Sequence, residues 1–185
     1  VFQSRTPKEQ EWLLAFAIFP IISVKLVEEF YGEEAVTQLR NIANEHAFIQ
    51  SLGDNETFRY HALFHQFLTN KWRQTDRGKY AELNKKATYY YLEKNNYFQA
   101  AYHATLTEDN RYLSEILSKT SETIIRSGQF DWFLEVYQKL DRDITDEFYA
   151  RYYYEGEVHR YRAYYEQARR AYIRCLQHAE KNDDA

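Results

Sequence analysis

The second half of the chain is built from apolar residues at helical spacing. From Lys79 onward, apolar faces recur every three or four residues, and short polar breaks separate them. No strand signal interrupts this pattern. The whole chain holds five glycines and two prolines beside a charged fraction of 28%, a composition that disfavours turn-rich β architectures. The sequence therefore predicts an all-α fold.

The predicted helices of this half pair into antiparallel hairpins with short turns. Their apolar faces are Tyr80, Leu83, Ala87, Tyr90 and Tyr91; Phe98, Ala101 and Ala104; Tyr112, Leu113, Ile116, Leu117 and Ile124; and Phe133, Leu134, Tyr137 and Leu140. Residues 152–175 then space small and aromatic side chains as a tetratricopeptide repeat does, which lets two helices approach closely. We predict a TPR-like helical repeat domain over residues 75–185.

The first half carries local signals for three short helices. Thr6-Pro7-Lys8-Glu9 has the form of a capping box with proline at the first helical position, and Pro20 stops that helix. Ser23 caps a second helix that ends at Gly32, and a third follows with apolar residues at helical spacing.

A β-hairpin and a fourth helix complete this half. Strand-forming residues flank a small polar turn at residues 53–56, and an amphipathic helix follows with Leu63, Phe64, Phe67, Leu68 and Trp72. Three helices followed by a hairpin is the order of a winged-helix unit. We therefore predict a winged-helix-like unit plus an arm helix over residues 1–74.

Composition and charge narrow the class of protein. A single cysteine allows no intramolecular disulfide, and no apolar run is long enough for a membrane helix, which predicts a cytoplasmic protein without a membrane partner. Seven basic and nine acidic residues precede position 75, so no basic footprint for nucleic acid appears there. The recognition helix of a DNA-binding unit would fall at residues 34–46, where Arg40 is the basic residue beside Glu34 and Glu45. We expect no direct DNA contact.

Two groups of residues suggest a catalytic or metal site. His61 and His65 have the spacing at which two imidazoles share a metal, but Ala62 stands where a zinc protease needs its glutamate. The alternative is that both histidines seat the arm helix against the hairpin. Cys175 lies at a helical position that favours a small buried structural cysteine over a nucleophile. We predict no metal site, no catalytic residue and no enzyme activity.

The most basic stretch lies near the end of the chain. Its arginines are interleaved with tyrosines, which is the pattern of a surface that stacks on bases: Arg160, Arg162, Arg169, Arg170 and Arg174. The alternative is that Glu166 pairs with Arg169 or Arg170 on the outer face of the last helix while the tyrosines pack between repeats.

Tyrosine is unusually abundant, with 18 residues and runs at 89–91 and 152–154. Three successive residues of a helix cannot all face one core, so some of these rings reach a groove or solvent. Rings with a polar tip suit a ligand in the concave surface of a helical array. We predict a ligand or partner surface that includes Tyr91, Tyr102, Tyr153 and Tyr161, with packing between helices as the alternative.

Two segments carry a resemblance to a known family. FRYHALFHQFL at residues 58–68, followed by AELNKKATYYYLEKNNYFQAAYHATLTED at residues 81–109, resembles the MalT-type large LuxR-family transcriptional regulators, which are signal-transduction ATPases of the STAND class. In that family a nucleotide-binding domain precedes the winged helix, a helical array binds the inducer, and a DNA-binding domain usually comes last.

The resemblance implies an excised, non-catalytic sensor and signal-transmission fragment. The sequence contains no GxxxxGK[ST] stretch, so ATP is expected in a missing upstream domain and no cofactor in this one. The implied partners are an inducer or a peptide or protein, the nucleotide-binding and DNA-binding domains of the same full-length chain, and, as a further option, a second copy of the chain. The alternative function is a free-standing TPR-like scaffold for protein–protein interaction.

Overall fold

The computed structural model describes residues 2–3, 5–45, 48–53, 55–140 and 150–183. The chain divides into two compact units, residues 1–83 and 84–185, and each is described by itself. The expected boundary between the two domains, at residue 74, falls one residue before the end of the helix Ala62–Thr75. It stays a prediction.

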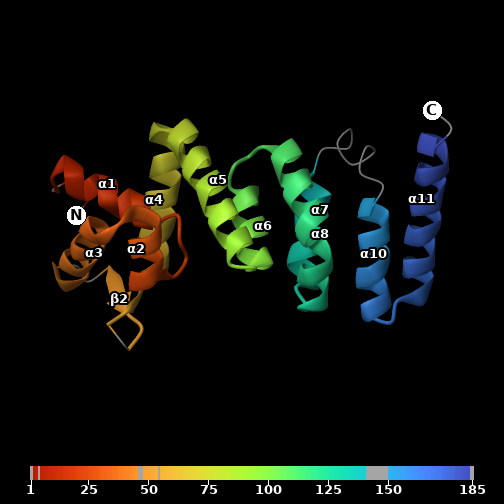
Figure 1. Ribbon diagram of the computed structural model, residues 1–185, viewed down its shortest axis with the longest axis horizontal. Coiled ribbons are helices and arrows are strands. Elements are labelled where there is room, and N and C mark those ends of the chain that lie inside the picture. The colour runs from red at the N-terminus through yellow and green to blue at the C-terminus, as the bar shows by residue number, and fades with distance from the viewer. Residues whose placement is uncertain (1, 4, 46–47, 54, 141–149, 184–185) are drawn as a thin grey trace. The chain divides into compact units, whose positions relative to one another are not determined.

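The first unit has the predicted order of elements. They are α1 (Pro7–Phe16), β1 (Ile22–Ser23), α2 (Val24–Tyr31), α3 (Glu33–Glu45), β2 (Ile49–Ser51), β3 (Thr57–Tyr60), α4 (Ala62–Thr75) and the first turns of α5 (Arg77–Glu93) (Figure 1). Three helices, a small antiparallel sheet and a following helix form a winged-helix unit, which confirms that part of the predicted fold class.

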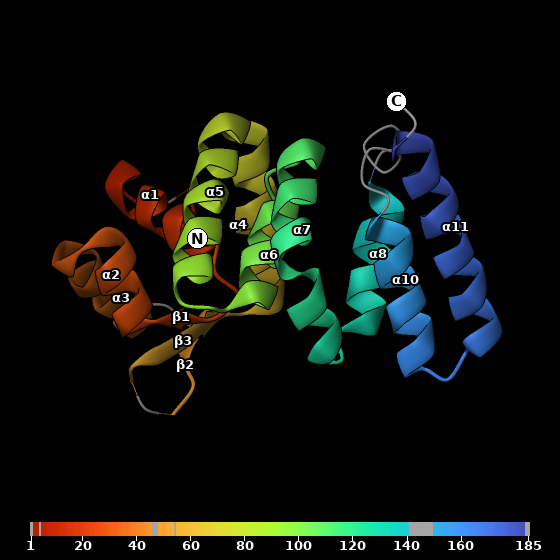
Figure 2. The same ribbon diagram turned by 45° about the vertical axis from the view of Figure 1, so that its right-hand side comes forward.

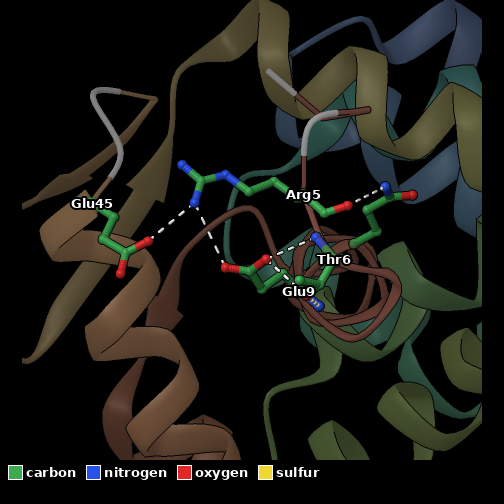
Figure 3. A network of polar contacts seen from close by, with 5 residues as sticks. Arg5, Thr6, Glu9 and Glu45 are labelled. Atoms are coloured by element: carbon green, nitrogen blue, oxygen red, sulfur yellow. Dashed lines mark hydrogen bonds and ion pairs between the residues drawn. The ribbon is translucent and has the colours of Figure 1, made fainter.

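The start of α1 is fixed by the predicted capping box. The side chain of Thr6 accepts a hydrogen bond from the backbone N–H of Glu9, and the Glu9 carboxylate accepts one from the N–H of Thr6 (2.9 Å). Arg5 bridges this carboxylate to Glu45 of α3, at 3.6 and 3.1 Å, as Figure 3 shows. The capping motif therefore sets the helix start and also links it to α3.

The sheet has one strand more than the sequence predicts. β2 and β3 form the expected hairpin, and β1 pairs with the other edge of β3, giving the order β1-β3-β2 (Figure 2). Ile22 lies opposite Phe58, and Ser23 lies opposite Thr57. The prediction of a hairpin alone was incomplete, because a strand of two residues has no periodicity to detect.

Side chains from three other elements satisfy backbone carbonyls near the end of α1. Tyr60 donates its hydroxyl to the carbonyl of Leu13 (3.2 Å), and Tyr31 donates to that of Ala15 (2.8 Å). Nε2 of His65 lies 2.8 Å from the carbonyl oxygen of Ala17. Carbonyls at a helix end lack partners within the helix, so these contacts fix α1 against the sheet, α2 and α4.

The apolar residues of α4 divide into two stripes. Leu68 and Trp72 are buried, whereas Leu63 is 72% exposed and Phe67 is 46% exposed. The helix is thus amphipathic as predicted, but its apolar residues are not all on the buried face: the half-buried ring of Phe64 stacks on the exposed ring of Phe67, 6.1 Å away.

The second unit is a helical array. It begins within α5 and continues through α6 (Tyr97–Thr105), α7 (Asn110–Arg126), α8 (Phe130–Lys139), α10 (Ala150–Tyr161) and α11 (Tyr165–Asp183). Its core gathers the predicted apolar faces of α6, α7 and α8, with Ala101, Leu117 and Phe133 almost fully buried, and Val158 of α10 joins them. This confirms the helical part of the predicted fold class.

The last two helices form an antiparallel pair that packs closely at a glycine (Figure 1). A Cβ built on Gly156 of α10 would lie 2.6 Å from Cδ1 of Tyr172 and nearer still to Cε1, so the Tyr172 ring occupies the space that a side chain would need. Cys175 of α11 is half-buried rather than buried as expected, and its neighbours on the same helix face, Ala171, Tyr172, His178 and Ala179, are buried or half-buried. No helix among the described residues is long and apolar enough to cross a membrane.

Candidate functional site

Two of the four predicted tyrosines share one pocket. Tyr153 and Tyr161 of α10 lie two turns apart on one face, opposite Ile125 of α7, and the pocket between the two helices measures about 110 Å³. Both rings are about half exposed, at 47% and 48%. The α10 helix thus presents its tyrosines toward a neighbouring helix and toward solvent at once.

Charged residues of both signs border the rings. Glu122 and Arg126 form an ion pair one turn apart on α7 (2.6 Å), and Glu157 and Arg160 form another on α10 (2.6 Å). The guanidinium of Arg160 also lies over the ring of Tyr161, 4.5 Å from its centroid. The pocket therefore offers aromatic faces, hydrogen-bond donors and acceptors, a combination that suits a polar or amphipathic ligand.

A hydrogen bond holds Glu157 in place. Tyr172 of α11 donates its hydroxyl to the Glu157 carboxylate (2.5 Å). The bonds from Arg160 and Tyr172 lower the pKa of the Glu157 carboxyl, while burial and the bond to Glu157 raise the pKa of Tyr172 to about 12. At neutral pH the Glu157 carboxylate of the pocket is thus ionised, and it lies beside the protonated phenol of Tyr172.

Tyr102 lines a different pocket. That pocket measures about 260 Å³ and lies among α6, α7 and α8, with Trp132 and Leu113 as its large apolar residues. Tyr102 itself is half-buried, and burial raises the pKa of its hydroxyl. Tyr102 therefore lines a pocket other than the one that Tyr153 lines.

Tyr91 packs inside the array. Its ring stacks on the imidazole of His103 at 5.3 Å. His103 is fully buried, and its Nδ1 donates a hydrogen bond to the side-chain oxygen of Asn84 (2.9 Å), which is also fully buried. Burial lowers the pKa of His103 to about 3, so the ring is neutral. Here the alternative expectation, packing between helices, describes the contacts of Tyr91.

The four tyrosines thus belong to three places, and a role in binding stays a prediction for each. Residue spacing did not predict the α7 ion pair of the Tyr153 pocket, Glu122 and Arg126, or Trp132 in the pocket of Tyr102. A glutamate and an arginine four residues apart are common on exposed helix faces. Nothing in their spacing indicates that Glu122 and Arg126 face α10.

The two histidines of the winged-helix unit have different surroundings. No group of three or more histidine, cysteine or acidic side chains that could hold a metal lies among the described residues. His65 uses Nε2 on the carbonyl of Ala17, and desolvation lowers its pKa. His61 is exposed and precedes α4 as its N-cap residue, without a side-chain capping bond. His65 therefore seats the arm helix against the end of α1.

The basic stretch is partly neutralised. Arg160 pairs with Glu157, and Arg162 pairs with Asp131 of α8 (2.5 Å). Arg169, Arg170 and Arg174 are exposed. In the described part of the chain, the ion pairs do not include the expected bond from Glu166 to Arg169 or Arg170.

The position of a recognition helix is not basic either. In α3, Arg40 pairs with Glu56 of the hairpin turn at 2.8 Å, and the first turn carries Glu33 and Glu34. A phosphate backbone would meet more negative than positive charge on this helix.

The winged-helix unit matches a known family. Residues 1–80 match the family model of the MalT winged helix domain. The chain is also similar to the HTH-type transcriptional regulator MalT of Vibrio parahaemolyticus serotype O3:K6, with 25% identity over 113 residues. That similarity covers 60% of this chain and 12% of the relative, so the chain spans a small part of the protein that it matches. The winged-helix unit is thus similar in sequence to the MalT winged helix domain.

Proposed function

We propose that this chain is a sensor and signal-transmission part of a MalT-like transcriptional regulator. In this function the helical array binds an inducer or a protein partner. The winged-helix unit then transmits the resulting shift in conformational equilibrium to other domains of a longer protein. The observation that carries the proposal is the match of residues 1–80 to the MalT winged helix domain, and the helical array of the second unit contains pockets of about 110 and 260 Å³.

The finer assignments also belong to this proposal. They are membership of the LuxR family and of the STAND class, a TPR-like array, a role in activation and a cytoplasmic location. We place ATP in a nucleotide-binding domain outside this chain and DNA contact in a separate DNA-binding domain. The fragment itself would be non-catalytic and would need no cofactor, and it could act as a monomer or within a homo-oligomer.

The pocket with Tyr153 and Tyr161 is our choice for the ligand surface. It lies between α7 and α10, so a ligand there contacts two different helices. A ligand that binds one arrangement of these helices better than another would shift the equilibrium between the two arrangements by its difference in affinity. That is the energetic requirement for transmitting a signal.

A thermal-shift screen of the 185-residue chain tests this function. The panel holds sugars, short peptides and nucleotides, because a ligand that binds only the folded state raises the melting temperature. We expect at least one hit, which Tyr153→Ala and Tyr161→Ala weaken. Tyr165→Ala is the matched control, since Tyr165 is 69% exposed and lies outside the pocket. A hit that responds equally to all three variants would refute the assignment of the pocket.

The second candidate function is a free-standing scaffold for protein–protein interaction. It rests on the close α10–α11 pair at Gly156, which is the type of helix pairing that repeat scaffolds use. The complete open reading frame separates the two functions: a nucleotide-binding domain upstream of the winged-helix unit supports the regulator, and a frame without one supports the scaffold.

A further inference from the structure

The winged-helix unit contains a cleft that the proposed function does not use. It measures about 380 Å³, and its apolar lining comes from four helices: Trp12 and Ala15 of α1, Tyr31 of α2, Trp72 of α4 and Leu83 of α5. A volume of this size with mostly apolar walls is typical of small-molecule sites. Two indoles and a phenol thus line this cleft.

The walls of this cleft are held in place by other contacts. Trp12 stacks on Phe16 at 5.5 Å and meets the ring of Tyr31 edge-on at 6.0 Å. The Tyr31 hydroxyl donates to the carbonyl of Ala15, which fixes the ring. Trp72 is 4% exposed and packs on Tyr80. The rings therefore need little rearrangement to accept a flat ligand, which lowers the entropic cost of binding.

Two ion pairs stand at the rim. Lys8 of α1 pairs with Glu34 of α3 (2.8 Å), and Glu11, one turn further along α1, pairs with Lys79 of α5 (2.9 Å). The side chains are 49–67% exposed. Exposed pairs of this kind contribute little to stability, so a ligand can replace either partner. The mouth thus offers an ammonium group for a carboxylate and a carboxylate for an ammonium group.

We propose that this cleft binds a small molecule with a flat aromatic ring and a zwitterionic head group, the chemistry of a free aromatic amino acid. The ring lies against Trp12 and Tyr31, where stacked and edge-on contacts between aromatic groups are favourable, and the almost fully buried Trp72 forms part of the cleft wall. The head group exchanges with the rim pairs, its carboxylate meeting a lysine and its ammonium a glutamate. This site lies in residues 1–83 and is separate from the pocket of Tyr153.

Isothermal titration calorimetry of the 185-residue chain with three probes tests the proposal. L-tryptophan carries both the ring and the head group, indole carries the ring alone, and L-alanine carries the head group alone. We expect L-tryptophan to bind at one site, indole to bind several-fold more weakly, and L-alanine to give no binding heat. No heat with L-tryptophan would overturn the proposal, and equal affinities for indole and L-tryptophan would overturn the role of the rim pairs.

Variants locate the bound probe. Ala15→Leu adds apolar volume inside the cleft and should abolish binding of both ring probes. Lys79→Ala should weaken L-tryptophan several-fold and leave indole unchanged, whereas Lys25→Ala removes an exposed lysine of α2 outside the cleft and should change neither. Circular dichroism melting shows whether each variant folds. If Ala15→Leu does not fold, the comparison of Lys79→Ala with Lys25→Ala still tests the site. Equal effects of the two lysine variants, or loss of binding in Tyr153→Ala, would overturn the site.

Discussion

Replacing Gly156 by alanine should destabilise the array, although glycine is a poor helix former. In an unhindered helix, the change from glycine to alanine stabilises by about 1 kcal/mol. At Gly156 the new Cβ would lie 2.6 Å from Cδ1 of Tyr172, which is far inside contact distance. Overpacking of this kind costs about 1–3 kcal/mol. The ring of Tyr172 must move to relieve it.

Moving the ring has a second cost. Tyr172 donates its hydroxyl to Glu157, one residue after the glycine, so a displaced ring loses this bond. A hydrogen bond to a charged group contributes about 1.5–3 kcal/mol, and less where water can replace the donor, as at this half-buried site. The two penalties exceed the gain in helix propensity. We expect Gly156→Ala to lower the free energy of unfolding by about 1–2 kcal/mol.

Gly78 provides the matched control. It lies in the first turn of α5, where an added Cβ would meet only the Asp76 carboxylate oxygen, at an ordinary 3.7 Å. Gly78→Ala should therefore stabilise, by up to about 1 kcal/mol. Urea unfolding followed by circular dichroism measures both variants. Amide hydrogen exchange then shows whether α10 and α11 lose protection in Gly156→Ala.

A second substitution tests the cause of the destabilisation rather than its direction. Tyr172→Leu removes the ring, so adding Gly156→Ala to it should no longer destabilise, and the double-mutant cycle should show a coupling of about 1 kcal/mol or more. The close approach would be refuted as the cause if Gly156→Ala alone is as stable as the parent protein. It would also be refuted if Gly156→Ala lowers the free energy of unfolding equally with and without Tyr172.

Four further predictions concern other parts of the chain. Asn84→Leu removes the partner of the His103 Nδ1–H and should lower the free energy of unfolding by about 1–3 kcal/mol in urea titrations; an unchanged midpoint would show that the bond is dispensable. The pKa of His103 is about 3 when folded and 6.5 when unfolded, so the unfolded chain binds the extra proton between these values and stability falls as pH drops below 6.5. The slope is at most about 1.4 kcal/mol per pH unit, and His103→Gln should have a flatter profile in denaturation curves taken across this window. Ser23→Ala deletes the cap that accepts from the N–H of Leu26 (3.0 Å) and should cost about 1 kcal/mol, measured by thermal unfolding beside the exposed-site control Lys25→Ala. Finally, a gel-shift assay at low salt should show no retardation of duplex DNA, because Arg40 of α3 is paired with Glu56; clear retardation would contradict the charge argument.

The parts of the fold that the sequence predicts well depend on local signals. The capping box at Thr6, the cap at Ser23 and the stop at Gly32 each involve side chains and backbone within a few residues, and the structure has all three. The strand β1 was missed for the opposite reason. Two residues show no alternation, and the partner strand lies beyond α2 and α3 in the sequence.

The candidate site shows the same division between local and distant contacts. Tyr153 and Tyr161 are eight residues apart on one helix, so helical spacing already places them on one face. Tyr91 and Tyr102 belong to other helices, and their surroundings depend on how those helices pack. Sequence spacing gives no register between helices. It therefore could not show that Tyr91 stacks on His103 or that Glu122 faces α10.

Ser23 has two structural roles, and these link the register of the small sheet to the start of α2. It is the last residue of β1, opposite Thr57, and its side chain caps α2. The next residue, Val24, donates its N–H to the carbonyl of Glu56 in the hairpin turn (2.8 Å). A shift of the sheet by one residue would turn Ile22 away from the core and separate the start of α2 from the turn. A slipped register would therefore cost the contact between the start of α2 and the hairpin turn as well as the pairing of the strands.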